Sequence, residues 1–192
     1  KLLDKNGADY IHVDIMDGHY VPNITFGPNI VKSLRKVTSK ILDVHLMIKP
    51  VKKYINEFVE AGSDIITFHP EADDDPEEII RMISDAEIKA GIAIHPEVNI
   101  EDIDHLFNKV QQIIVMTVTP GFGGQKFMHD QVQKIKDLDE IRKNNNYNYE
   151  IAVDGGVNNE NAKICKDNGA NVLAVGSYLL SQNQNNYNKI IN

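Results

Sequence analysis

The sequence has little cysteine, no long apolar run and no excess of basic residues. Its only cysteine, Cys165, rules out a disulfide between two residues of the chain. No apolar run approaches the roughly 20 residues that a transmembrane helix needs, so we expect no membrane partner. The formal net charge of −8 disfavours a nucleic-acid surface, so we expect no nucleic-acid partner. Because the net charge is negative, an anionic ligand would need nearby positively charged or hydrogen-bond-donating groups to attract it.

The remaining composition is ordinary for a soluble globular protein. Apolar residues make up 42% of the sequence and charged residues 25%. A chain of 192 residues is long enough for one domain with a sizeable core. We therefore expect a single domain over residues 1–192 and a cytoplasmic location.

Short runs of β-branched and apolar residues alternate with amphipathic helical patterns along the whole chain. The expected strands are Tyr10–Ile15, Ile41–Met47, Asp64–His69, Gly91–His95, Gln112–Val118, Glu150–Val153 and Val172–Val175. The expected helices are Pro28–Val37, Val51–Ala61, Pro76–Ala90, Ile100–Phe107, Val132–Lys143, Asn159–Asn168 and Tyr187–Ile191. Three glycines shortly before strands, Gly7, Gly62 and Gly169, are typical of helix ends. This alternation predicts parallel strands joined by right-handed crossovers.

Seven strands fit either an open doubly wound sheet or a (β/α)8 barrel that lacks one unit. Barrel active sites are built from several strands at their C-terminal ends, whereas a doubly wound sheet concentrates its chemistry at one switch point. The polar residues at or near expected strand ends are spread over several strands: His12, Asp14, His45, His69, Asp154 and Gly176. We therefore predict the α/β class and a (β/α)8 TIM barrel.

The start of the sequence is unusual for such a barrel. Lys1–Gly7 has the pattern of the last turn of an amphipathic helix, with no helix start before it. A (β/α)8 barrel normally needs about 200 or more residues. A chain of 192 residues that starts inside a helix is short by about one strand. We therefore expect an N-terminally incomplete domain whose first strand is missing from the sequence shown.

The stretch Tyr10–Gly18 carries the first part of a candidate metal site. On a strand, alternate side chains share a face, so His12, Asp14 and Met16 point the same way. A histidine and a carboxylate two residues apart on one face are poorly explained by packing alone. They are well explained as two ligands of a divalent metal ion.

The strand Ile41–Met47 repeats this pattern with Asp43, His45 and Met47 on one face. His45 is a further candidate ligand, and Asp43 is either a group that orients a ligand or an ordinary inward polar residue. Asp154 ends a later strand and completes a set of two histidines and two carboxylates. Such nitrogen and oxygen ligands suit zinc, iron, manganese or cobalt, and the sequence does not choose among them.

Glycine-rich turns supply candidate anion-binding groups. In Gly121-Phe122-Gly123-Gly124, three glycines in four residues free backbone N–H groups to point at one anion. Gly176-Ser177 ends the last expected strand and starts a helix. Barrels often bind phosphate with the loops after their last two strands and a helix N-terminus. Together with the metal set, these turns predict an anion site.

Two aspartates on a metal beside a phosphate pocket suit a keto-sugar phosphate. A metal bound to the ketone and a neighbouring hydroxyl oxygen stabilises an enediolate. Carboxylates on opposite faces would remove and return a proton at one carbon, which inverts that carbon. Asp14 and Asp154 come from strands far apart in the sequence, which permits this arrangement. The methionines near strand ends would either fill the core or exclude water from the reacting carbon: Met16, Met47 and Met116.

Taken together, these motifs resemble the ribulose-phosphate 3-epimerase family. They occur in the family's order over nearly the whole chain and are specific in combination. The matching segments are His12–Gly18, Val21–Gly27, Leu42–Met47, Pro120–Gln125, Val153–Gly156 and Gly176–Ser177. The resemblance implies a (β/α)8 barrel that interconverts D-ribulose 5-phosphate and D-xylulose 5-phosphate at carbon 3. This reaction belongs to the pentose phosphate pathway of carbohydrate metabolism.

The resemblance also implies a role for each candidate site residue. One divalent metal ion, zinc first among those named above, would be held by His12, Asp14, His45 and Asp154. Asp14 and Asp154 would be the catalytic acid/base pair. The residues implied to contact substrate and phosphate are His12, Met16, His45, Met47, Met116, Gly121, Phe122, Gly123, Gly124, Gly155, Gly156, Gly176 and Ser177. The implied partner is a small sugar phosphate, and because homo-oligomers occur in the family, a homo-oligomer is a further expectation.

The sequence departs from the family pattern at two places. It lacks the first strand with its Pro-Ser-Ile/Leu-Leu segment, whose serine contacts substrate in the family. At His95-Pro96-Glu97, the family has a small or neutral residue before the proline and glycine or alanine after it. This second departure would alter the mouth of the barrel rather than the metal chemistry.

Two alternative functions stay open. The first is a sibling epimerase that acts on a six-carbon sugar such as allulose 6-phosphate, whose metal site would look the same. The second is a catalytically inactive binder of a sugar phosphate or a metal. Retention of every candidate ligand argues against the inactive binder, because a pure binder needs no pair of bases.

Overall fold

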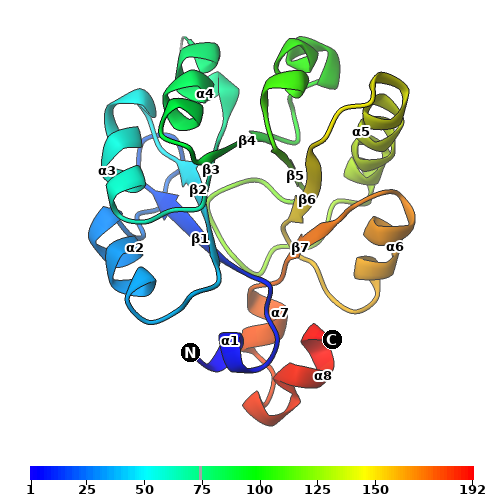
Figure 1. The fold of residues 1–192 in the computed structure, drawn as a ribbon. Helices are drawn as coiled ribbons and strands as arrows, with labels where there is room; N and C mark the ends of the chain where they lie inside the picture. Colours follow the sequence, from blue (N-terminus) through cyan, green and yellow to red (C-terminus); the bar gives the residue numbers. More distant parts are fainter. Residues whose placement is uncertain (74) are drawn as a thin grey trace.

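The computed structural model describes residues 1–73 and 75–192 of the chain. Within them, seven parallel strands form one curved sheet with helices around it (Figure 1). The strands follow one another in sequence order, and each is hydrogen-bonded to the next. They are β1 (Tyr10–Met16), β2 (Ile41–Met47), β3 (Ile65–Phe68), β4 (Lys89–Ile94), β5 (Gln112–Met116), β6 (Glu150–Asp154) and β7 (Val172–Ala174).

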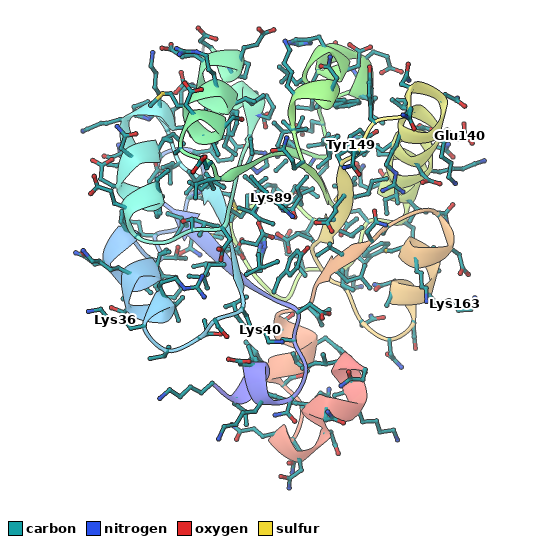
Figure 2. All side chains as sticks on the ribbon, in the orientation of Figure 1. Lys36, Lys40, Lys89, Glu140, Tyr149 and Lys163 are labelled. Carbon is teal, nitrogen blue, oxygen red and sulfur yellow. The ribbon has the colours of Figure 1, made fainter. Side chains whose placement is uncertain are left out.

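Helices connect the strands and cover the outer face of the sheet. The α-helices are α1 (Leu2–Lys5), α2 (Pro28–Arg35), α3 (Ile55–Glu60), α4 (Pro76–Asp85), α5 (Val132–Asn145), α6 (Asn161–Asp167), α7 (Ser177–Leu180) and α8 (Tyr187–Ile191). The 3₁₀ helices are η1 (Lys52–Tyr54), η2 (Pro70–Ala72), η3 (Ile100–Asp102), η4 (Asp104–Lys109), η5 (His129–Gln131) and η6 (Gln184–Asn186). Charged side chains of this layer, such as Lys36, Glu140 and Lys163, lie at the outer edge of the molecule (Figure 2).

The prediction of seven strands is confirmed, although several of their bounds differ. The strands predicted to end at His69, His95, Val118 and Val175 stop one or two residues earlier, because the chain turns there into loops. The glycines predicted to end helices are confirmed, since Gly7, Gly62 and Gly169 have φ angles of 100°, 94° and 110° after α1, α3 and α6. None of the helices in the described part of the chain has the length and apolar character needed to cross a membrane.

The α-helix predicted over Ile100–Phe107 is wrong, because this segment forms the two 3₁₀ helices η3 and η4. Ile100, Ile103 and Leu106 are three residues apart and all buried. A 3₁₀ helix has three residues per turn and therefore places them on one face. The backbone bonds confirm this spacing, since N–H of Ile103 donates to the carbonyl of Ile100 at 3.1 Å and N–H of Leu106 to that of Ile103 at 3.0 Å.

Among the other predicted helices, two differ most from the observed bounds. The helix predicted over Pro76–Ala90 ends at Asp85, because Glu87 adopts a φ of 60° and β4 begins at Lys89. The helix predicted over Val51–Ala61 begins with the 3₁₀ turn η1 and becomes α-helical only in α3.

The strands are buried on both faces. The side chains of Val13 and Val44 face the helices and belong to the main apolar core. The opposite face of the sheet carries a smaller apolar cluster that includes Ala93, Ile114 and Ala152. Alternate side chains along each strand therefore supply two separate layers, as in a barrel whose interior is filled.

The strands β1 and β7 are the two edges of the sheet. Within the described residues, no ladder joins β7 to β1. The two edges face each other in Figure 1, with α1, α7 and α8 gathered below them. Helix α8 contacts the segment before β1, since Nδ2 of Asn188 donates to the carbonyl of Asn6 at 3.3 Å. The fold is a nearly closed (β/α)8 TIM barrel that lacks one strand, which confirms the predicted fold class.

Candidate metal and substrate site

The register of β1 and β2 brings three of the predicted metal ligands together. His12 lies opposite Asp43, and Asp14 lies opposite His45. All four side chains point to the inner face, because alternate residues of a strand share a face. Nδ1 of His12 is 2.8 Å from Oδ2 of Asp43, and Nδ1 of His45 is 3.2 Å from Oδ1 of Asp14. Each histidine is therefore paired with a carboxylate of the neighbouring strand.

Asp154 reaches the same point from the end of β6. Its Oδ2 lies 3.8 Å from Nε2 of His12 and 3.6 Å from Nδ1 of His45. Nε2 of His12 is also 3.2 Å from Oδ1 of Asp14. One ligand atom from each of these four residues lies within 4.8 Å of the other three. The fold thus brings the four predicted ligands together from three strands.

The donor atoms of this cluster fit a divalent cation. Nδ1 of His12 is bound by Asp43, which leaves Nε2 facing the other ligands. Within the described residues, this buried Nε2 atom has no hydrogen-bond partner in good geometry, and buried polar atoms are rarely left so. Two imidazole nitrogens and two carboxylates around one point are ligands that zinc, iron, manganese and cobalt accept.

The electrostatics of the cluster favour positive charge at its centre. Burial alone would lower the pKa of His12, but the carboxylates of Asp43 and Asp14 raise it well above its ordinary value. The pKa of His45 is likewise raised, because the nearby carboxylates of Asp14 and Asp154 outweigh burial. Burial would raise the pKa of Asp14, but the two histidines hold it below its usual range. Protons and a metal ion would therefore compete for the same nitrogens.

Asp43 is held from its other side as well. Its Oδ1 accepts a hydrogen bond from Nε2 of Gln112 at 3.0 Å, and the same amide donates to Oγ1 of Thr67 at 3.2 Å. All three side chains are buried. Asp43 therefore orients His12, which is the first of the two interpretations that the sequence leaves open.

His69 is a neighbour of the cluster to which the sequence analysis assigns no role, although it places this residue at a strand end. It follows β3, and its Nε2 lies 3.0 Å from Nε2 of His45. Burial lowers the pKa of His69 to about 4, so its ring is neutral at neutral pH. The other nitrogen, Nδ1, lies 3.3 Å from Oε1 of Glu71.

A pocket opens beside the cluster and is lined by most of the predicted substrate residues. Asp14 and Asp154 form part of its wall, together with the buried methionines Met16, Met47 and Met116. The other predicted residues in the lining are Gly121, Phe122, Gly123, Gly124, Gly155, Gly156, Gly176 and Ser177. Of the predicted substrate contacts, His12 and His45 are not in this lining. Five lining residues had no predicted role: Val118, Pro120, Gln125, Val157 and Ala174.

Two glycines of the pocket lie where a side chain has no room. A Cβ atom on Gly155 would lie 2.5 Å from Cγ2 of Val118, and one on Gly156 would lie 2.8 Å from the backbone nitrogen of Phe127. Their φ angles are 122° and 64°. The backbone after Asp154 therefore needs glycine both for its conformation and for the close approach of neighbours.

The glycine-rich turn after β5 is braced by amide side chains. Nδ2 of Asn23 donates to the carbonyl of Gly121 at 2.7 Å. Nε2 of Gln125 donates to the carbonyls of Thr119 at 2.6 Å and Phe122 at 2.8 Å. The ring of Phe122 stays 55% exposed at the rim. This loop is held by contacts from two sides, which limits the ways its N–H groups can point.

Comparisons with known proteins match one family over most of this chain. The model of the family described as "Ribulose-phosphate 3 epimerase family" matches residues 1–180. A curated ribulose-phosphate 3-epimerase from Bacillus subtilis is 44% identical over 183 residues, which cover 95% of this chain and 84% of the relative. A ribulose-phosphate 3-epimerase from Escherichia coli K12 is 38% identical over 187 residues, covering 96% and 82%.

Solved structures of other proteins share the fold. A 3-keto-L-gulonate-6-phosphate decarboxylase from Vibrio cholerae superimposes with a TM-score of 0.70 at 17% identity, covering 95% of this chain and 83% of the other. A mutant tryptophan synthase α-subunit from Pyrococcus furiosus gives a TM-score of 0.73 at 15% identity, covering 99% and 87%. At such low sequence identity, these structural similarities support the barrel fold alone.

Proposed function

We propose a function from the premise that this chain belongs to the ribulose-phosphate 3-epimerase family. The function is the epimerisation of D-ribulose 5-phosphate to D-xylulose 5-phosphate at carbon 3. The observation that carries it is the cluster of His12, Asp14, His45 and Asp154, whose ligand atoms lie within 4.8 Å of one another. Both aspartates also line the pocket that contains the glycine-rich turns.

The four clustered residues would hold one divalent metal ion. Zinc is the first candidate, and iron, manganese and cobalt accept the same ligands. His12 would bind through Nε2 and His45 through Nδ1, because their other ring nitrogens contact Asp43 and His69. The chemistry that such an ion supplies is Lewis-acid stabilisation of the enediolate formed at the ketone of the substrate.

Asp14 and Asp154 would be the two bases. They enter the site from β1 and β6, and both carboxylates are partly exposed, 40% for Asp14 and 18% for Asp154. One carboxylate would remove the proton from carbon 3 and the other would return a proton from the opposite face, which inverts that carbon. Each proton transfer by a positioned carboxylate typically contributes about 10²- to 10⁴-fold in rate.

The remaining pocket residues would bind the substrate and shield it. The N–H groups of Gly121 to Gly124, with those of Gly155, Gly156, Gly176 and Ser177, would bind phosphate and hydroxyl groups, since all these residues line the pocket. The three methionines would cover the reacting carbon and exclude water. The substrate class is therefore a small sugar phosphate. The cytoplasmic location, the homo-oligomer and the single domain over residues 1–192 stay predictions.

The test is xylulose 5-phosphate formation from ribulose 5-phosphate before and after chelation, with single metals then restored. We expect turnover that a chelator abolishes and a divalent ion restores. Allulose 6-phosphate serves as the competing substrate, and a higher rate with it would move the assignment to the six-carbon sibling. Metal binding without turnover on either substrate would favour the inactive binder and contradict the proposal.

A further inference from the structure

The two histidine ligands are supported in different ways. Nδ1 of His12 contacts the carboxylate of Asp43 directly at 2.8 Å. Nε2 of His45 instead contacts a second imidazole, Nε2 of His69, at 3.0 Å. His45 and His69 are both fully buried. A metal-binding histidine generally donates its other N–H to a carboxylate, a carbonyl or water, and the partner fixes the tautomer of the ring. His45 therefore depends on the protonation pattern of His69.

The chain of contacts continues from His69 to a carboxylate. Nδ1 of His69 lies 3.3 Å from Oε1 of Glu71, and the hydroxyl of Tyr20 donates to the same oxygen at 2.7 Å. Within the described residues, this Nδ1 atom has no hydrogen-bond partner in good geometry, so its approach to Glu71 is a charge contact. The ring of Tyr20 also lies against His69, with 4.8 Å between the ring centroids. The buried His69 ring is thus held in place by His45, Glu71 and Tyr20.

The short contact between the two imidazoles determines which ring nitrogen of His45 and of His69 carries a proton. A metal ion on Nδ1 of His45 leaves the one proton of that ring on Nε2. Only one of the two facing Nε2 atoms can donate across 3.0 Å, so Nε2 of His69 accepts and the proton of its ring lies on Nδ1, beside Oε1 of Glu71. Nδ1 of His45 consequently faces Asp14 and Asp154 as the nitrogen available to a metal ion.

We propose that His69 and Glu71 are positioning residues for His45, which hold its ring in the Nε2–H tautomer so that Nδ1 is offered to the metal ion. This inference rests on the proposed function, because it needs the metal to be bound. Neither residue lines the substrate pocket. Their effect is therefore on metal affinity and on the tautomer of His45, and only through these on turnover.

The experiment measures zinc affinity by competition with a chromophoric chelator. Removing such an outer partner of a ligand typically costs about 10- to 100-fold in metal affinity, so we expect that loss for His69→Phe. His69→Gln should recover most of it, because its amide oxygen can accept from His45 and its amide nitrogen can donate to Glu71. Glu71→Leu should weaken zinc binding, whereas Glu71→Gln keeps an acceptor and should weaken it less. His105→Phe, on the exposed face of η4, is the matched control and should bind zinc like the parent.

A second readout separates positioning from packing. Side-chain ¹⁵N NMR of the zinc-loaded parent should show the proton of His45 on Nε2 and that of His12 on Nδ1. In Glu71→Leu, the signal of His45 should change while that of His12 stays the same, because Asp43 is untouched.

The outcomes decide between the inference and the function beneath it. A parent that binds neither zinc nor cobalt would overturn the proposed metal site and this inference with it. A parent that binds metal, together with a His69→Phe variant of equal affinity and unchanged His45 tautomer, would overturn the inference alone. If His69→Phe does not fold, Glu71→Leu decides in the same way, because it leaves the His45–His69 contact in place.

Discussion

The substitution Asp154→Asn tests the two-base mechanism most directly. The asparagine side chain is nearly the same size and shape, and the backbone carbonyl of residue 154 keeps its bonds from N–H and Oγ1 of Thr117 at 2.8 and 3.1 Å. The carboxylate itself lies 3.6 and 3.8 Å from the nearest histidine nitrogens, beyond good hydrogen-bond distance. We therefore expect the free energy of unfolding, measured in urea, to change by no more than about 1 kcal/mol.

The effect on catalysis should be far larger than the effect on the fold. Loss of one acid/base group typically costs about 10²- to 10⁴-fold in rate, which equals about 2.7 to 5.4 kcal/mol of activation free energy. Because Asp154 is also a proposed metal ligand, kcat is measured at saturating metal, and bound metal is quantified in each sample. A loss of rate that persists in the metal-loaded variant then belongs to the missing base.

Deuterium exchange makes the test specific. In D₂O, Asp154→Asn keeps Asp14 as its remaining base, so one of the two epimers should exchange its carbon-3 proton without being converted. Asp14→Asn should exchange the other epimer, which ¹H NMR resolves. Epimerisation at the parent rate by either metal-loaded variant, or exchange of the same epimer by both, would refute the assignment of one base to each face.

Three further predictions follow from the same geometry. Gly155→Ala would place a Cβ 2.5 Å from Val118 at a φ of 122°, so the free energy of unfolding should fall by about 1 to 3 kcal/mol, and an unchanged urea midpoint would contradict this. Without metal, the raised pKa values of His12 and His45 stabilise the fold below pH ~6.5 and lose this effect as the pH rises through the folded-state values, while the lowered pKa of Asp14 loses its effect as the pH falls below ~4. The melting temperature of the metal-free protein should therefore fall both as the pH rises above this range and as it falls below it. Zinc at 100 times its Kd should add about 2.7 kcal/mol, and a melting temperature that ignores zinc would exclude binding to the native state.

The strands and their order could be predicted because parallel strands have a strong local signal. Runs such as Ile41–Met47 are apolar and β-branched, and both faces of such a strand are buried. Helix ends marked by glycine, as at Gly62, could be predicted equally well. The end of α4 could not be predicted in this way, because the residue with a left-handed backbone conformation there is Glu87, a residue type that rarely adopts it.

The metal cluster could be predicted because its chemistry lies in short segments. His12 and Asp14 share a strand face by simple alternation, and the same holds for Asp43 and His45. The alternation of side chains along one strand does not predict the register between two strands. The pairing of His12 with Asp43, rather than with His45, decides which ring nitrogen of His12 is free, and this pairing follows from the observed β1–β2 register.

The contact between His45 and His69 shows where sequence reasoning stops. The register pairs His45 with Thr67, and His69 is the next inward position after Thr67, beyond the last residue of β3. The two imidazoles therefore meet diagonally, across a distance that depends on the twist of the sheet and on the turn into η2. No pattern within either segment contains that information. From the sequence, a histidine such as His69 at the end of a barrel strand can be interpreted either as a residue that fills the interior or as one that positions a metal ligand. The 3.0 Å contact between Nε2 of His69 and Nε2 of His45 favours the second interpretation.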